Sequence, residues 1–130
     1  MLQLKLQQFL IDIHGQGKVA STIFIGTQNK QTIKRLFDAN KKNVLEELKD
    51  NLETLHSKGY KIFPSLDNYQ KEHQSYDGGF TVGNYGSHNK NGINTIQLEF
   101  GWNLRCLGNI DQTAKVLSDA TAIFIKNQNT

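Results

Sequence analysis

Short apolar runs, set apart by polar or glycine-rich stretches, are the main pattern along the chain. Runs rich in β-branched and apolar residues predict strands at residues 9–14, 19–27, 60–63, 80–84 and 93–99. Residues 1–8 fit two interpretations: a strand, because their leucines alternate, or the tail of a helix that leads into the first strand. Residues 65–79 are polar and aromatic without a clear period, which favours a functional loop.

Helical patterns separate several of these strands. Residues 32–39 predict a short helix, and apolar residues at three- and four-residue spacing predict a longer helix that begins at Asn43. Asn43 can cap the free N–H groups there, and Gly59 supplies the stop signal. A last helix is predicted from Asp111, with an apolar side that includes Ala114, Leu117, Ile123 and Phe124. Strands that alternate with helices predict an α/β layered fold.

The composition indicates a globular protein and gives no sign of a membrane span or a signal peptide. The 130 residues make one domain, and 37% hydrophobic with 21% charged residues is typical of a globular protein. No apolar run approaches the ~20 residues of a membrane span, and the first residues lack the layout of a signal peptide. Cys106 is the single cysteine, which fits a reducing compartment, so a cytoplasmic location is expected.

The net charge of +3 makes the chain mildly basic. Its lysines and arginines are spread along the sequence, and the densest cluster is Lys30, Lys34, Arg35, Lys41 and Lys42. Nucleic-acid binding usually needs a basic stripe within a recognisable module, and no such module is visible. We therefore expect neither a nucleic-acid nor a membrane partner.

Two predicted strands end on groups that can do chemistry. His14 closes the first strand and shares a face with Asp12, while Glu99 closes the last and shares a face with Gln97. In an α/β sheet, ligands collect outside the carboxyl ends of the strands, so His14 and Glu99 are expected on one rim. Imidazole is a common zinc ligand, and a partly buried carboxylate has the raised pKa of a useful general base.

Each of these features also has a purely structural interpretation. His14 taken alone fits a structural histidine at a strand end. Glu99 taken alone fits a solvated strand end or a salt bridge to Arg105. The glycine-dense residues 77–86 lack the Gly-Lys-Ser/Thr ending of a phosphate loop, and they fit either a loop whose backbone comes close to another group or a simple hairpin.

The order and spacing of three motifs point to a known family. The strings DIHG (12–15), GGFTVGNYG (78–86) and NTIQLEFGWNLR (94–105) resemble the C-terminal part of the N-formylglutamate amidohydrolases, which belong with the zinc carboxypeptidase-like hydrolases. The resemblance covers residues 9–105, and its most specific element is Ile-Gln-Leu-Glu. It implies an α/β fold of three layers, with a mixed sheet and flanking helices: phosphorylase/hydrolase-like, of a truncated zinc-exopeptidase type.

The resemblance also implies roles for individual residues. His14 matches the family's zinc ligand, and Glu99 matches the carboxylate that takes a proton from the attacking water. Arg105 lies where the family has an arginine that can hold a substrate carboxylate. Tyr85 is expected to donate a hydrogen bond to substrate, and Gly79 to lie in the same substrate-binding segment. The implied substrate is a small carboxylate-bearing amide, such as an N-formyl amino acid.

One departure from the family affects the zinc site. The family takes further zinc ligands from a segment upstream of the DIHG strand, and Met1 stands only 13 residues before His14. Residues 1–130 are therefore expected to form a single α/β domain that lacks the family's N-terminal segment. A catalytic zinc has three protein ligands, and the matched motif supplies one. His73 and His88 lie in predicted loops and fit either replacement ligands or, as is more usual, surface histidines.

Three hypotheses follow for function. The first is a zinc-dependent amidohydrolase or peptidase whose zinc site is completed elsewhere. The second is a truncated, inactive relative that serves as a binding module. The third is a basic interaction protein whose motif matches are accidental. A small sheet with an exposed edge strand also predicts a homodimer, in which a second copy covers that edge.

Overall fold

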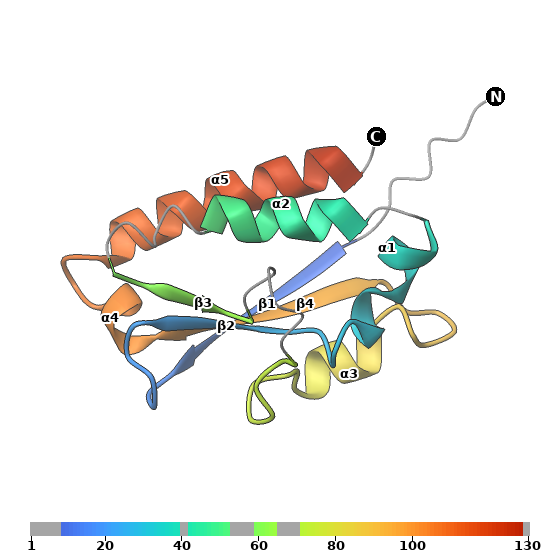
Figure 1. The fold of residues 1–130 in the computed structure, drawn as a ribbon, viewed down its shortest axis with the longest axis horizontal. Coiled ribbons are helices and arrows are strands. Elements are labelled where there is room, and N and C mark those ends of the chain that lie inside the picture. The colour runs from blue at the N-terminus through green and yellow to red at the C-terminus, as the bar shows by residue number, and fades with distance from the viewer. Residues whose placement is uncertain (1–8, 40–41, 53–58, 65–70, 129–130) are drawn as a thin grey trace.

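A mixed four-stranded sheet forms the centre of the computed structural model, which describes residues 9–39, 42–52, 59–64 and 71–128 (Figure 1). The elements follow in the order β1 (Phe9–Gln16), β2 (Thr22–Gly26), the 3-10 turn η1 (Gln31–Ile33), α1 (Lys34–Asp38), α2 (Lys42–Leu52), β3 (Lys61–Phe63), α3 (Phe80–Tyr85), β4 (Asn94–Gly101), α4 (Trp102–Arg105) and α5 (Ile110–Gln128).

The strands stand in the order β1-β4-β2-β3. β1 runs parallel to β4, β3 runs parallel to β2, and β2 is antiparallel to β4. Figure 1 shows α2 and α5 side by side on one side of the sheet and α3 on the other. The predicted mixed α/β architecture with flanking helices is therefore confirmed. Within the described sheet β1 and β3 are the edge strands, and a second copy on such an edge stays a prediction.

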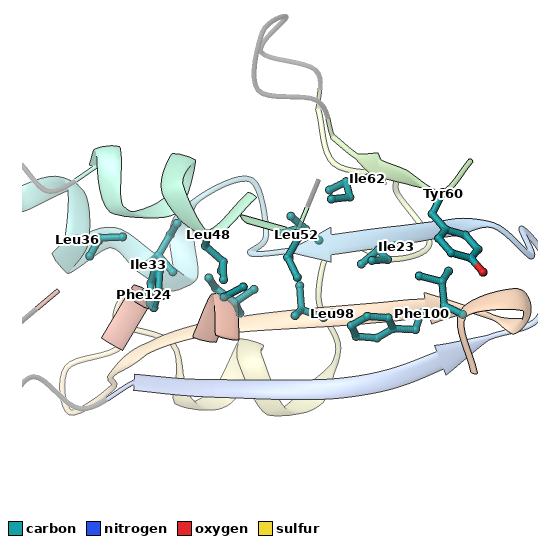
Figure 2. Close-up of a cluster of buried hydrophobic side chains, with 14 residues drawn as sticks. Ile23, Ile33, Leu36, Leu48, Leu52, Tyr60, Ile62, Leu98, Phe100 and Phe124 are labelled. Carbon is teal, nitrogen blue, oxygen red and sulfur yellow. The ribbon is translucent and has the colours of Figure 1, made fainter. Parts of the chain in front are cut away.

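The main core lies between the sheet and the pair α2 and α5 (Figure 2). Leu48 and Leu52 stand four residues apart on α2, so both side chains face the sheet and are fully buried. Phe124 of α5 is also fully buried, and its ring centroid lies 4.4 Å from that of Phe9 on β1. The alternation of β4 sends Ile96, Leu98 and Phe100 into this core, which leaves its other side chains for the α3 face.

Most of the predicted elements are present with shifted ends. One predicted element has the wrong type: residues 80–84 are not a strand, because Phe80–Tyr85 form the helix α3. The β-branched residues at 81 and 82 gave the segment its strand character. Val82 is fully buried in α3, and its carbonyl oxygen accepts hydrogen bonds from the Gly86 N–H and the Thr95 hydroxyl. These tertiary contacts outweigh the local propensity.

The residues that the last helix buries also differ from those predicted for its apolar side. Ala114 and Ile123 are exposed, while Leu117 is half-buried and Phe124 is buried. The inward side of α5 holds the buried Thr113, Ala120 and Phe124 and the half-buried Val116 and Leu117, whose spacing of one, three and four residues keeps them on one side of the helix. The short helix α4 has no counterpart among the predictions. The predictions for residues 1–8, for the Asn43 cap and for residues 65–70 lie outside what the structure describes.

None of the helices described here is long and apolar enough to cross a membrane.

Candidate functional site

His14 and Glu99 lie directly beside each other at the carboxyl ends of β1 and β4. The parallel register pairs Asp12 with Gln97 and His14 with Glu99. Since side chains alternate along a strand, all four project from the same face of the sheet. That face is the one toward α3, because Gln97 contacts Gly79 just before this helix. The sheet thus places the two predicted residues on one rim.

The imidazole of His14 stands between two carboxylates. Its Nε2 lies 2.8 Å from Asp12 Oδ2, and its Nδ1 lies 4.0 Å from Glu99 Oε1. The first distance is a hydrogen bond and the second is too long for one. Because a carboxylate accepts and does not donate, Nε2 carries the proton, and a neutral ring then presents its Nδ1 lone pair toward the Glu99 side. The His14 side chain is 47% exposed, so this edge of the ring can be reached from solvent.

The Glu99 carboxylate is more enclosed, with its side chain 14% exposed. Burial raises the pKa of Glu99 above its ordinary value; His14 acts in the opposite direction, and Asp12 adds to the rise. A carboxyl group with a raised pKa is a better proton acceptor in its ionised form. The electrostatics of Glu99 are therefore those of a candidate general base.

A buried glutamine connects Glu99 to the segment before α3. Gln97 Oε1 accepts a hydrogen bond of 2.8 Å from the Gly79 N–H, and Gln97 Nε2 donates one of 3.2 Å to Glu99 Oε1. A Cβ at Gly79 would come within 3.0 Å of Gln97 Oε1, so the close approach favours glycine at this position. The predicted close backbone approach near Gly79 is toward Gln97.

Arg105 lies at the same ends of β1 and β4 and binds their backbone. Its Nε donates to the Phe100 carbonyl at 3.1 Å, and its Nη2 donates to the Gln16 carbonyl at 3.3 Å. The guanidinium packs on Gly15, where a Cβ would lie 2.7 Å from Arg105 Cζ. Arg105 therefore connects the residues that follow His14 and Glu99. The Nε and Nη2 donors on one edge of its guanidinium already bind main-chain carbonyl groups.

Other residues considered from the sequence lie elsewhere. Tyr85 is exposed and lines a surface hollow with Leu10, Asn91 and Ile93, at the opposite end of β1 and β4 from His14. His73 packs in an aromatic cluster with Phe24 and Tyr76. His88 lies in the turn that follows α3, with its Nδ1 buried against Gly86. The structure thus brings His14 and Glu99 together and separates Tyr85 from them. Arg105 lies at the same strand ends, but its guanidinium covers Gly15 on the opposite face of the sheet from His14.

The donor set fits part of a zinc site. A zinc-binding histidine almost always donates its other ring N–H to a carboxylate or carbonyl, and Asp12 takes this position for His14. A catalytic zinc needs three protein ligands. Across residues 9–39, 42–52, 59–64 and 71–128, no group of three His, Cys, Asp or Glu side chains is placed to hold an ion. The described residues therefore fit one zinc ligand with its supporting carboxylate.

Sequence reasoning placed Asp12 and Gln97 on the right face but gave them no role. The alternation along each strand was the available signal, since it sets Asp12 beside His14 and Gln97 beside Glu99.

Comparisons with protein-family models, curated proteins and solved structures gave no match for this chain.

Proposed function

We propose that the chain contributes the His14–Glu99 part of a zinc-dependent amidohydrolase site that acts on an N-acyl amino acid, such as an N-formyl amino acid, or on a peptide amide bond. The observation that carries the proposal is the register of the parallel strands, which sets His14 beside Glu99 with Asp12 on the far ring nitrogen. The motif resemblance gives the substrate class. The single cysteine favours a cytoplasmic setting for this activity.

The residues divide the chemistry among themselves. Asp12 holds the His14 ring in the tautomer that leaves Nδ1 able to bind a metal. A bound zinc ion would polarise the amide carbonyl and lower the pKa of the attacking water. Glu99 takes the proton from that water and passes it to the leaving amine. By the motif resemblance, Arg105 would hold a substrate carboxylate that reaches past the strand ends, through the guanidinium donors that the main chain does not use.

Zinc binding by the purified protein tests the first half of this proposal. We expect the wild-type protein to bind added zinc, and His14→Ala to bind it with a large loss of affinity. His88→Ala is the matched control, because His88 lies beside Gly86 and the start of β4, at the opposite end of the strand from Glu99, and zinc binding should survive there. Equal zinc content in wild type and His14→Ala would rule out His14 as a ligand.

Hydrolysis tests the second half. Glu99→Gln should keep zinc and lose about 10²- to 10⁴-fold in kcat on N-formylglutamate or another N-formyl amino acid, the usual contribution of general base catalysis. Unchanged kcat in this variant would contradict the role of Glu99.

A second candidate function is an inactive relative that serves as a binding module. It is favoured by one observation: the described residues do not group three metal ligands. Binding of N-formylglutamate without turnover, at saturating zinc, would support this candidate over the enzyme.

A further inference from the structure

We propose that Gln97 is the positioning residue for Glu99, and that it makes the orientation of this carboxylate depend on the backbone at Gly79. The proposal rests on the proposed function, in which Glu99 is the base. It adds a residue for which the motif comparison gave no role.

The buried amide of Gln97 has its two ends fixed by different partners. Gln97 is 4% exposed, so its amide must find partners within the protein. A backbone N–H can only donate, so the hydrogen bond from Gly79 requires the oxygen of the amide to face Gly79. The NH2 group is thereby turned toward Glu99, where it donates to Oε1. The orientation of the amide follows from this network.

Two titratable groups, Asp12 and His14, lie near the Glu99 carboxylate. Asp12 is a like charge near Glu99, and His14 Nδ1 is 4.0 Å away, beyond hydrogen-bonding distance. Gln97 supplies a direct donor to Oε1. A donor held in a fixed direction restricts rotation of the carboxylate and stabilises its ionised form.

The Gly79 backbone is itself held in place. Two residues earlier, the Asp77 carbonyl oxygen accepts a hydrogen bond from the Gln28 N–H. Tyr76 stacks on Phe24 with ring centroids 4.4 Å apart, and Phe24 is the register partner of Glu99 on β2. If Gly79 moved away, the amide could rotate and present its oxygen to the carboxylate, which would repel it. The direction of the hydrogen bond that Gln97 donates to Glu99 therefore depends on the position of the Gly79 backbone.

The first test needs no mutation. In metal-free wild-type protein, the side-chain NH2 resonances of Gln97 should shift with pH at the same midpoint as the Glu99 carboxyl carbon, both followed by NMR. Gln16 is the matched control, because it is an equally buried glutamine whose NH2 donates to the Val19 and Thr22 carbonyls. Its resonances should stay flat at that midpoint. A flat Gln97 response, or equal responses from both glutamines, would overturn the proposal.

The second test uses Gln97→Met, which keeps the length of the side chain and removes the donor. The Glu99 midpoint should move to higher pH, because the ionised form loses a hydrogen bond. Thr95→Val is the control on the same face of β4, since it removes the bond from the Thr95 hydroxyl to the Val82 carbonyl and leaves Glu99 untouched. An unchanged midpoint in Gln97→Met, or the same shift in both variants, would count against positioning by Gln97. If Gln97→Met does not fold, the wild-type NMR test still decides.

These measurements separate the two proposals. They report the link between Gln97 and Glu99 in the absence of zinc and substrate, so they can succeed where hydrolysis fails. If hydrolysis is found, Gln97→Met should lower kcat and move the acid limb of the kcat profile to higher pH, while Thr95→Val should leave that limb in place.

Discussion

At the scale of single residues, the site depends on burial and on close approach. Glu99 is a carboxylate enclosed enough for its pKa to rise, and Gly15 lets the Arg105 guanidinium lie directly on the backbone. The position of each group on its strand could be predicted, because alternation fixes the face. The hydrogen bond from His14 to Asp12 could not, because it depends on rotamers that only the folded surroundings select.

The raised pKa of Glu99 predicts how stability varies with pH. The folded state binds the Glu99 proton more tightly than the unfolded chain, so ionised Glu99 lowers the free energy of unfolding. This loss is absent below the ordinary glutamate pKa, grows as pH rises toward the folded-state pKa, and is constant above it. Glu99→Gln cannot ionise, so its stability relative to wild type should increase across that range.

Urea denaturation of both proteins at a series of pH values measures this difference. Burial also raises the pKa of Glu72, but Glu72 is present in both proteins and its contribution cancels. A stability difference that is the same at every pH would show that Glu99 has an ordinary pKa in the folded protein.

Two glycines make a matched pair for a second prediction. A Cβ at Gly26 would lie 2.5 Å from the Tyr76 carbonyl oxygen, a backbone atom, while a Cβ at Gly17 would meet nothing within 4 Å. Gly26→Ala should therefore lower the free energy of unfolding by about 1–3 kcal/mol, the usual cost of overpacking. Gly17→Ala should change it by less than ~1 kcal/mol. Chemical denaturation compares them, and equal values would contradict the close packing of the 76–78 backbone on β2.

At the scale of elements, the segment at 71–79 is fastened to the end of β2. Glu72 accepts hydrogen bonds from the Thr27 N–H at 2.7 Å, from the Asn29 N–H at 2.9 Å, and from the Thr27 hydroxyl. In return, the Glu72 N–H donates to the Asn29 side-chain oxygen at 3.0 Å. These bonds span more than forty residues of sequence and hold the segment that carries Gly79. The polar loop was predictable as a feature, but its anchor was not, because no local pattern connects Glu72 to Thr27.

Removal of this anchor is expected to loosen the segment. Glu72→Ala leaves the buried Thr27 N–H and hydroxyl without their acceptor, which should cost about 1–3 kcal/mol of stability. The amide protons of Thr27 and Asn29 should then exchange faster with deuterium. Glu46→Ala is the control, since Glu46 is exposed on α2. Unchanged exchange at Thr27 would show that other contacts hold the segment.

Helix α3 shows why element type cannot always be predicted from local sequence. Thr81 and Val82 favour a strand, yet the segment is helical because Val82 packs into the protein and its carbonyl is bonded from β4. Tyr85, to which the motif resemblance gives a hydrogen bond to substrate, lies on this six-residue helix and lines the hollow beside Leu10 and Ile93.

At the scale of the whole molecule, the sheet separates the apolar core from a face that carries the candidate site residues. The side with α2 and α5 holds the apolar core (Figure 2). By the register and the alternation of β1 and β4, the side chains of Asp12, His14, Gln97 and Glu99 project from the side with α3. Both faces use alternate residues of the same strands, so the core on one side fixes the register that pairs His14 with Glu99 on the other. Damage to the core should therefore lower stability and disturb the rim together.

Two neighbouring residues of α5 test this coupling. Phe124 is fully buried and its ring contacts Phe9 on β1, whereas Ile123 is 41% exposed. Phe124→Ala should lower the free energy of unfolding by about 3–5 kcal/mol, the usual range for a buried phenylalanine. Ile123→Ala should stay within about 0.5 kcal/mol of wild type, as surface substitutions do. In Phe124→Ala, because β1 loses its packing partner, the NMR resonances of His14 should also move relative to wild type. Denaturation and His14 spectra that respond equally to both substitutions would show that the α5 layer does not hold β1 in register.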